Sequence, residues 1–147
     1  MHISVRFIIF SCIAISAACG PMGPVPGGAI DGDSTSAPQS WASSDAVEVI
    51  TLETNPEKPY SVNIWAVGID PFLYVGASDS DSTWAQNIQQ DHRVRIRIGE
   101  AIHDLKAVQV DDPATQEVVR KAFIRKYEMD PEEAAFEGAA LFRLERR

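Results

Sequence analysis

The chain has 147 residues, which is enough for one domain and too few for two of ordinary size. Hydrophobic residues make up 45% of it and charged residues 23%, so a wholly disordered chain is excluded. The formal net charge of −8 disfavours nucleic acid as a partner, because a polyphosphate backbone would be repelled overall.

The N-terminal segment resembles the leader of a bacterial lipoprotein. A short basic start precedes the apolar stretch Phe7–Ala18, which has the length of a signal peptide rather than of a membrane span. Small residues, Ser16-Ala17-Ala18, stand directly before Cys19, as in the lipobox where the cysteine is acylated and becomes the new N-terminus. We therefore predict a signal peptide over residues 1–18 and lipidation at Cys19, which would attach the protein to a bilayer. An ordinary secretory signal with an incidental cysteine is the alternative.

Residues 19–44 are predicted to form the lipidated cysteine and a flexible tether. The stretch is rich in Gly, Pro and Ser and has no hydrophobic periodicity, so it has little apolar surface to bury. A tether of this composition and length would span roughly 25–30 Å. Gly20 stands where an Asp would resemble a signal for retention in the inner membrane. The expected location is therefore the cell envelope, at the outer membrane and facing the periplasm.

Residues 45–147 are predicted to fold as one domain, mainly β with α. Alternating or short apolar runs bounded by turn residues predict six antiparallel strands, over Ala46–Thr51, Tyr60–Val67, Phe72–Ala77, Arg93–Ile98, Ala101–Val110 and Leu141–Arg146. Capping residues and helical spacing predict two to three helices, at Trp84–Ile88, from Asp112-Pro113 to about Tyr127, and from Asp130-Pro131 to Gly138.

Four stretches carry a family resemblance when taken in order: Leu52–Val62, Leu73–Ser78, Trp84–Ile96 and Val110–Tyr127. They are similar to segments of the FMN-binding split β-barrel superfamily, which contains pyridoxamine-phosphate-oxidase-like and deazaflavin-dependent nitroreductase-like proteins. The resemblance covers about residues 47–144. It implies a split β-barrel that forms a homodimer, with a flavin or deazaflavin at the dimer interface.

The resemblance also implies where FMN or a deazaflavin of the F420 type would bind. The positions carried over are Ser61, Asn63, Trp65, Ala77, Ser78, Ser82, Thr83, Trp84 and Asn87. A helix N-terminus suits a phosphate, and an indole ring can stack on a flavin. The implied function is a membrane-tethered oxidoreductase of the nitroreductase or quinone-reductase type. No nucleophile motif is present, so no catalytic residue is predicted. No metal site is predicted either, because no His or Cys spacing suits one.

Two of these candidate residues also have a purely structural interpretation. Trp84 lies four residues before Ile88, a spacing that is typical of a side chain in the core. Asn87 lies on the same helix, where such a side chain commonly forms a hydrogen bond to a loop carbonyl.

Charge gives the reason for an alternative function. Asp79 and Asp81 would repel a phosphate, and no basic residue lies within residues 76–87. Arg93, Arg95 and Arg97 follow on the next strand, where they form a solvated face paired with acidic residues or, alternatively, reach round to the phosphate. The alternative function is a non-enzymatic split-barrel lipoprotein that binds a partner or small ligand without flavin.

Overall fold

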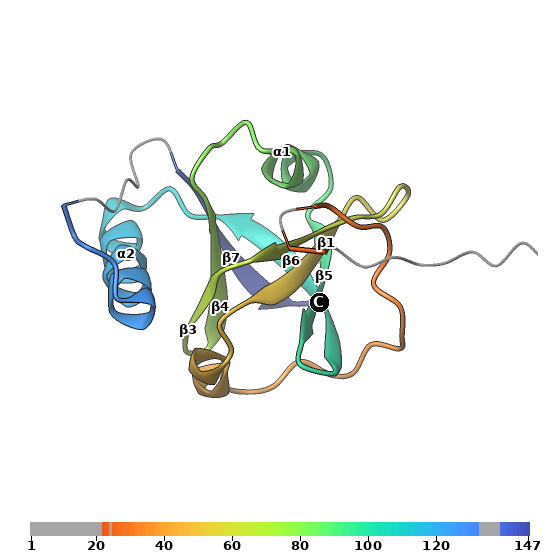
Figure 1. Ribbon diagram of the computed structural model, residues 1–147, viewed down its shortest axis with the longest axis horizontal. Coiled ribbons are helices and arrows are strands. Elements are labelled where there is room, and N and C mark those ends of the chain that lie inside the picture. The colour runs from red at the N-terminus through yellow and green to blue at the C-terminus, as the bar shows by residue number, and fades with distance from the viewer. Residues whose placement is uncertain (1–21, 24, 133–138) are drawn as a thin grey trace, which may run out of the picture.

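The computed structural model describes residues 22, 23, 25–132 and 139–147. These residues form one short 3-10 helix, two α-helices and seven strands (Figure 1). In chain order the elements are η1 (Ala42–Ala46), β1 (Ile50–Thr54), β2 (Tyr60–Ile64), β3 (Ala66–Ile69), β4 (Phe72–Ala77), α1 (Thr83–Gln90), β5 (Arg93–Ile98), β6 (Ala101–Gln109), α2 (Pro113–Tyr127) and β7 (Ala140–Arg146).

All strand pairs are antiparallel, and the sheet order is β2-β1-β5-β6-β7-β4-β3. The sheet curls around a core that α1 covers at one end, while α2 lies beside β3 (Figure 1). The predicted fold class, a mainly β split barrel, is confirmed.

Strand β5 shows how alternation in the sequence positions the core. Val94 and Ile96 are 1% and 0% exposed, because they face the interior of the curled sheet. The arginines between them point to the other face, as the period-2 pattern predicts.

Helix α2 occupies the predicted residues. The carboxylate of Asp112 accepts a hydrogen bond from the Thr115 N–H (2.8 Å), so the predicted N-cap is formed. Val119 and Phe123 are buried against β3, β4 and β7. The predicted helix that stops at Gly138 falls largely on residues 133–138, which lie outside the described residues.

Two strand predictions were wrong in detail. The first strand begins at Ile50 rather than at residue 46, because residues 42–46 form the helical turn η1, in which the Ser44 hydroxyl donates to the Trp41 carbonyl (2.6 Å). The second strand was predicted as continuous over Tyr60–Val67, but it is interrupted at Trp65. The interruption lets one half pair with β1 and the other with β4, so the described sheet has seven strands rather than six.

Residues 25–41, which we call the N-terminal strap, lie against the domain. The backbones of Gly27 and Ser61 exchange hydrogen bonds of 2.8 and 2.9 Å. Ile30 is 4% exposed and Trp41 is 3% exposed, so two apolar side chains hold the strap in place. The predicted flexible tether is therefore corrected for this segment, and the packed domain begins well before residue 45.

Arginines of β5 complete the attachment of the strap. The Arg95 guanidinium donates to the carbonyls of Ile30 and Gly32, at 2.8 Å each. The buried Glu53 carboxylate accepts the Ile30 N–H and lies 3.6 Å from Arg95. Arg95 pairs with the cross-strand carboxylates of Glu53 and Asp104, as predicted, but Arg95 and Arg97 also bind backbone carbonyls of the strap, and only Arg93 is mainly solvated.

Candidate functional site

The candidate site is a cavity of about 780 Å³ between the interruption after β2, the end of β4 and the start of α1; we call it the β4–α1 cavity. Its described lining residues are Gly23, Val49, Asn63, Ile64, Trp65, Gly76, Ala77, Ser78, Asp79, Ser82 and Trp84. A volume of this size is in the range of small-molecule and cofactor sites.

The cavity brings together most of the residues that the resemblance implied. Asn63 and Trp65 come from β2 and the residue after it, Ala77 and Ser78 from the end of β4, and Ser82 and Trp84 from the start of α1: in all, Asn63, Trp65, Ala77, Ser78, Ser82 and Trp84. Asn63 and Trp84 are 21 residues apart in the sequence, and the fold places all of these residues around one cavity.

The other three predicted residues are not among the residues that line this cavity. Ser61 is fully buried, and its backbone pairs with that of Gly27 in the strap. The Asn87 side-chain amide donates a hydrogen bond to Thr54 Oγ1 at the end of β1 (3.0 Å). Asn87 therefore has the structural role that was its alternative interpretation. Thr83 is exposed at the first turn of α1.

The two candidate tryptophans differ in what they offer a ligand. Trp84 is 7% exposed and packs in the core against Phe142, with ring centroids 5.7 Å apart. Trp65 is 45% exposed, and one face of its ring stacks on Tyr127 at 4.4 Å and 12°. The Trp65 indole is therefore a firmly supported aromatic surface on the cavity wall, whereas Trp84 serves mainly as core.

Tyr127 is itself fixed, which is why it can support Trp65. Its hydroxyl accepts the Ala66 N–H (2.9 Å) and donates to the Glu48 carbonyl (2.9 Å). Burial raises the pKa of Tyr127 above its ordinary value, so the donor proton is retained at neutral pH.

The Ser82 hydroxyl lacks a hydrogen-bond partner among the described residues. Its Oγ is buried. Ser82 is the N-cap of α1, yet its side chain makes no capping bond. Because a buried polar atom without a partner costs free energy, this hydroxyl is well suited to bind a polar group in the cavity.

Charge in the cavity suits a ring better than a phosphate. The described lining contains the Asp79 carboxylate and no Lys or Arg. Arg95 and Arg97 donate to backbone carbonyls of the strap, and Arg93 binds Asp91. The alternative in which these arginines reach a phosphate is therefore not realised. The aromatic surface and neutral hydroxyls fit the tricyclic ring of a flavin or deazaflavin, whereas its phosphate meets only a like charge.

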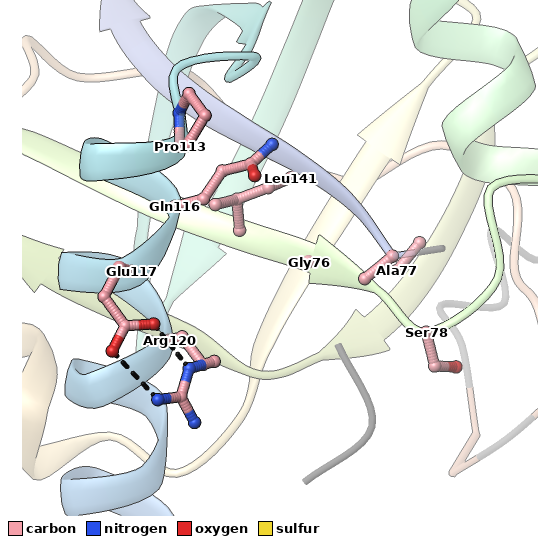
Figure 2. Close-up of a pocket in the computed structure, with 9 residues that line it drawn as sticks. Gly76, Ala77, Ser78, Pro113, Gln116, Glu117, Arg120 and Leu141 are labelled. Atoms are coloured by element: carbon pink, nitrogen blue, oxygen red, sulfur yellow. Dashed lines mark hydrogen bonds and ion pairs between the residues drawn. The ribbon is translucent and has the colours of Figure 1, made fainter. Parts of the chain in front are cut away.

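A second, smaller cavity of about 220 Å³ lies beside α2 and shares Gly76, Ala77 and Ser78 with the first (Figure 2). Figure 2 shows its only labelled cation, Arg120, bound to Glu117; two hydrogen bonds of 2.8 and 2.9 Å join them. This pairing lowers the pKa of Glu117 to about 2. Arg120 is thus already committed to a carboxylate.

Five lining residues were not predicted: Gly23, Val49, Ile64, Gly76 and Asp79. Gly23 and Val49 were placed in a tether and inside a strand, so neither could be assigned to a site. Asp79 was noted only as a charge that opposes phosphate. Its position two residues after the end of β4, next to Ser78 in the sequence, was the signal that could have assigned Asp79 to the site.

Within the part of the chain that the structure describes, no group of three or more His, Cys, Asp or Glu side chains could hold a metal ion. No helix of these described residues has the length and apolar character needed to cross a membrane.

Comparison with family models gives one match. Residues 39–138 match the family described as "uncharacterized protein conserved in bacteria" (DUF2255). The match covers β1 to α2, and it begins after most of the N-terminal strap. No curated protein matches the chain.

Solved structures with the same fold include proteins that bind redox cofactors. An F420-H2 dependent reductase (FDR-A) has 14% identity and a TM-score of 0.57, over 78% of this chain and 100% of that one. A FAD-binding protein from Mesorhizobium loti has 18% identity and a TM-score of 0.51, over 70% and 83%. The heme storage protein HutZ from Vibrio cholerae has 19% identity and a TM-score of 0.54, over 68% and 82%. The resemblance to split-barrel proteins is thereby confirmed at the level of the fold.

Proposed function

This chain belongs to the bacterial family DUF2255, and we propose that it is an envelope-attached split-barrel protein that binds the ring of a flavin or deazaflavin in the β4–α1 cavity and acts as an oxidoreductase. Support for a cofactor of this class comes from the neighbours in fold, which include an F420-dependent reductase and a FAD-binding protein.

One observation carries the proposal. The cavity combines an exposed indole, Trp65, with a buried hydroxyl, Ser82 Oγ, that has no partner among the described residues. A flat ring with a polar edge complements both features at once.

The residues of the cavity would bind and orient such a ring rather than react. Trp65, held by Tyr127, offers its free face for stacking, and Ser78 and Ser82 offer hydroxyls for a polar edge. When bound, a flavin or deazaflavin supplies hydride and electron transfer, which explains why the chain needs no nucleophile of its own. The nitroreductase or quinone-reductase type of reaction remains the specific proposal.

The test begins with the protein purified after export and its visible absorption spectrum. Saturable quenching of tryptophan fluorescence by riboflavin, FMN or a deazaflavin then measures binding. Ser82→Ala should weaken binding without lowering the free energy of unfolding, because it removes a buried hydroxyl that lacks a partner. Ser80→Ala is the matched control, since Ser80 is exposed and is not among the lining residues. Equal affinities for the two variants and the wild type would contradict the proposal.

The alternative function is a non-enzymatic split-barrel lipoprotein that binds a partner or small ligand without flavin. Asp79 in the cavity favours it, as does the likeness in fold to a heme storage protein. An absence of saturable quenching by all three ring compounds would select this alternative.

Attachment to the envelope is proposed separately, through lipid on Cys19. Support comes from the small residues that precede this cysteine after a short apolar stretch. Cys19→Ala should move the protein to the soluble fraction and abolish labelling by a fatty-acid analogue. Membrane fractionation that is unchanged and free of label would contradict it.

A further inference from the structure

We propose that the β4–α1 cavity selects an uncharged ring compound of the riboflavin class over its phosphorylated forms. The inference rests on the proposed function and makes it more specific, because it names which chemical form of the ring the cavity binds. The evident difference between riboflavin and FMN is the phosphate, so charge at the cavity decides between them.

The Asp79 carboxylate is held at the cavity wall by the turn that joins β4 to α1. Asp79 Oδ1 accepts the Asp81 N–H (2.8 Å), and the Asp79 carbonyl accepts the Ser82 N–H (3.1 Å). These bonds tie the carboxylate to the same turn that carries the Ser82 hydroxyl. Asp79 and Ser82 both line the cavity, so a ligand there lies near a negatively charged residue of this turn.

No described cation of the cavity lining compensates this charge. Arg120, in the neighbouring cavity, is bound by Glu117, and Arg95 is bound by strap carbonyls and lies near Glu53 and Asp104. The net charge of −8 adds an unfavourable background for any anion. A phosphate monoester carries between one and two negative charges at pH 7, so it would be repelled.

The groups that the cavity does offer are neutral. Ser78 and Ser82 present hydroxyls, and Trp65 presents an aromatic face. Hydroxyl groups both donate and accept hydrogen bonds, so they match the polar edge of an uncharged ring without any need for charge. The neutral hydroxyls and the aromatic face thus suit an uncharged ring compound.

The experiment compares riboflavin and FMN by fluorescence titration of the mature, full-length protein at 150 mM salt. We expect riboflavin to bind at least about fivefold more tightly, the factor that corresponds to like unit charges a few ångströms apart in water. Asp79→Asn keeps the Oδ1 acceptor of the turn and removes only the charge. It should raise FMN affinity by about fivefold and leave riboflavin affinity unchanged.

Asp81→Asn is the matched control, because Asp81 is exposed in the same turn but is not among the lining residues. Its effect on FMN should be smaller than that of Asp79→Asn, since charge interactions at this salt are screened over about 8 Å. The inference is overturned if FMN binds as tightly as riboflavin or more so, and loss of that FMN binding in Arg120→Gln would identify the cation responsible; the proposed function stands in that case. Binding of neither compound refutes the proposed function and this inference with it.

Discussion

Replacing Arg95 with glutamine removes one of the two β5 arginines that join the N-terminal strap to the sheet; the other is Arg97. Its guanidinium donates two hydrogen bonds of 2.8 Å, to the carbonyls of Ile30 and Gly32, and lies 3.6 Å from the buried Glu53 carboxylate. Glutamine is too short and has too few donors to restore all three interactions. The substitution therefore tests whether the strap is an integral part of the domain.

The expected loss follows from the number and exposure of these contacts. A hydrogen bond that involves a charged group contributes about 1.5–3 kcal/mol when it is buried. The Arg95 side chain is 25% exposed, so water replaces part of each bond in the variant. Glu53 is 6% exposed at its side chain and loses its nearby cation. We expect Arg95→Gln to lower the free energy of unfolding by about 2–3 kcal/mol.

Urea unfolding measures this loss, and hydrogen exchange shows where it acts. The amides of Gly27, Ile30 and Thr35 are bonded to the domain, and they should exchange faster in the variant than in the wild type. Arg93→Gln is the matched control on the same strand. Arg93 is 52% exposed and binds only the nearby Asp91 among the described residues, so its loss should cost less than about 0.5 kcal/mol.

The reasoning is refuted if Arg95→Gln and Arg93→Gln have the same stability within about 0.5 kcal/mol. It is also refuted if the strap amides exchange at the rate of an unfolded chain in the wild type. Either result would indicate that residues 25–41 form the flexible tether that their composition predicts.

Three further outcomes are expected. Trp84→Phe should lower the free energy of unfolding in urea by about 1–2 kcal/mol, because Trp84 packs in the core; an unchanged midpoint would contradict this. Burial raises the pKa of Tyr127 in the folded state, so the stability from its hydroxyl is present below pH 10 and lost as pH rises through the raised pKa. Tyr127→Phe should accordingly cost about 1 kcal/mol at pH 7, and its stability should fall less steeply than that of the wild type above pH 10. Light scattering at high micromolar concentration should give a homodimer, as the family resemblance implies; a monomer mass at that concentration would contradict this.

The parts of the fold that the sequence predicted are those governed by local rules. Strand β5 follows from alternation of arginines with Val94 and Ile96, and α2 follows from the cap at Asp112 and an apolar row that includes Phe123. Both signals lie within a few residues of the elements they specify. The interruption at Trp65 was missed because it depends on two different partner strands, which no local pattern reveals.

The strap was missed for a related reason. Arg95 binds backbone carbonyls more than sixty residues away in the sequence. Because every residue has a backbone carbonyl, the amino-acid sequence does not indicate which carbonyls an arginine will bind. The site was predicted in part because the positions carried over from the family lie on the strands that line the cavity. The resemblance does not predict which residues surround each side chain. The pairing of Ser61 with the strap and the position of Asp79 at the cavity were therefore missed.

If Cys19 carries lipid, the position of Gly23 limits the distance between the β4–α1 cavity and the bilayer. Gly23 lies at the β4–α1 cavity, and Cys19 precedes it by four residues, which span at most about 14 Å when fully extended. Lipid on Cys19 would therefore hold the cavity close to the lipid headgroups. A flexible tether over residues 19–44 would instead allow a distance of roughly 25–30 Å. Reactants dissolved in the membrane would meet such a site by lateral diffusion, and their concentration per unit area of bilayer would set the encounter rate.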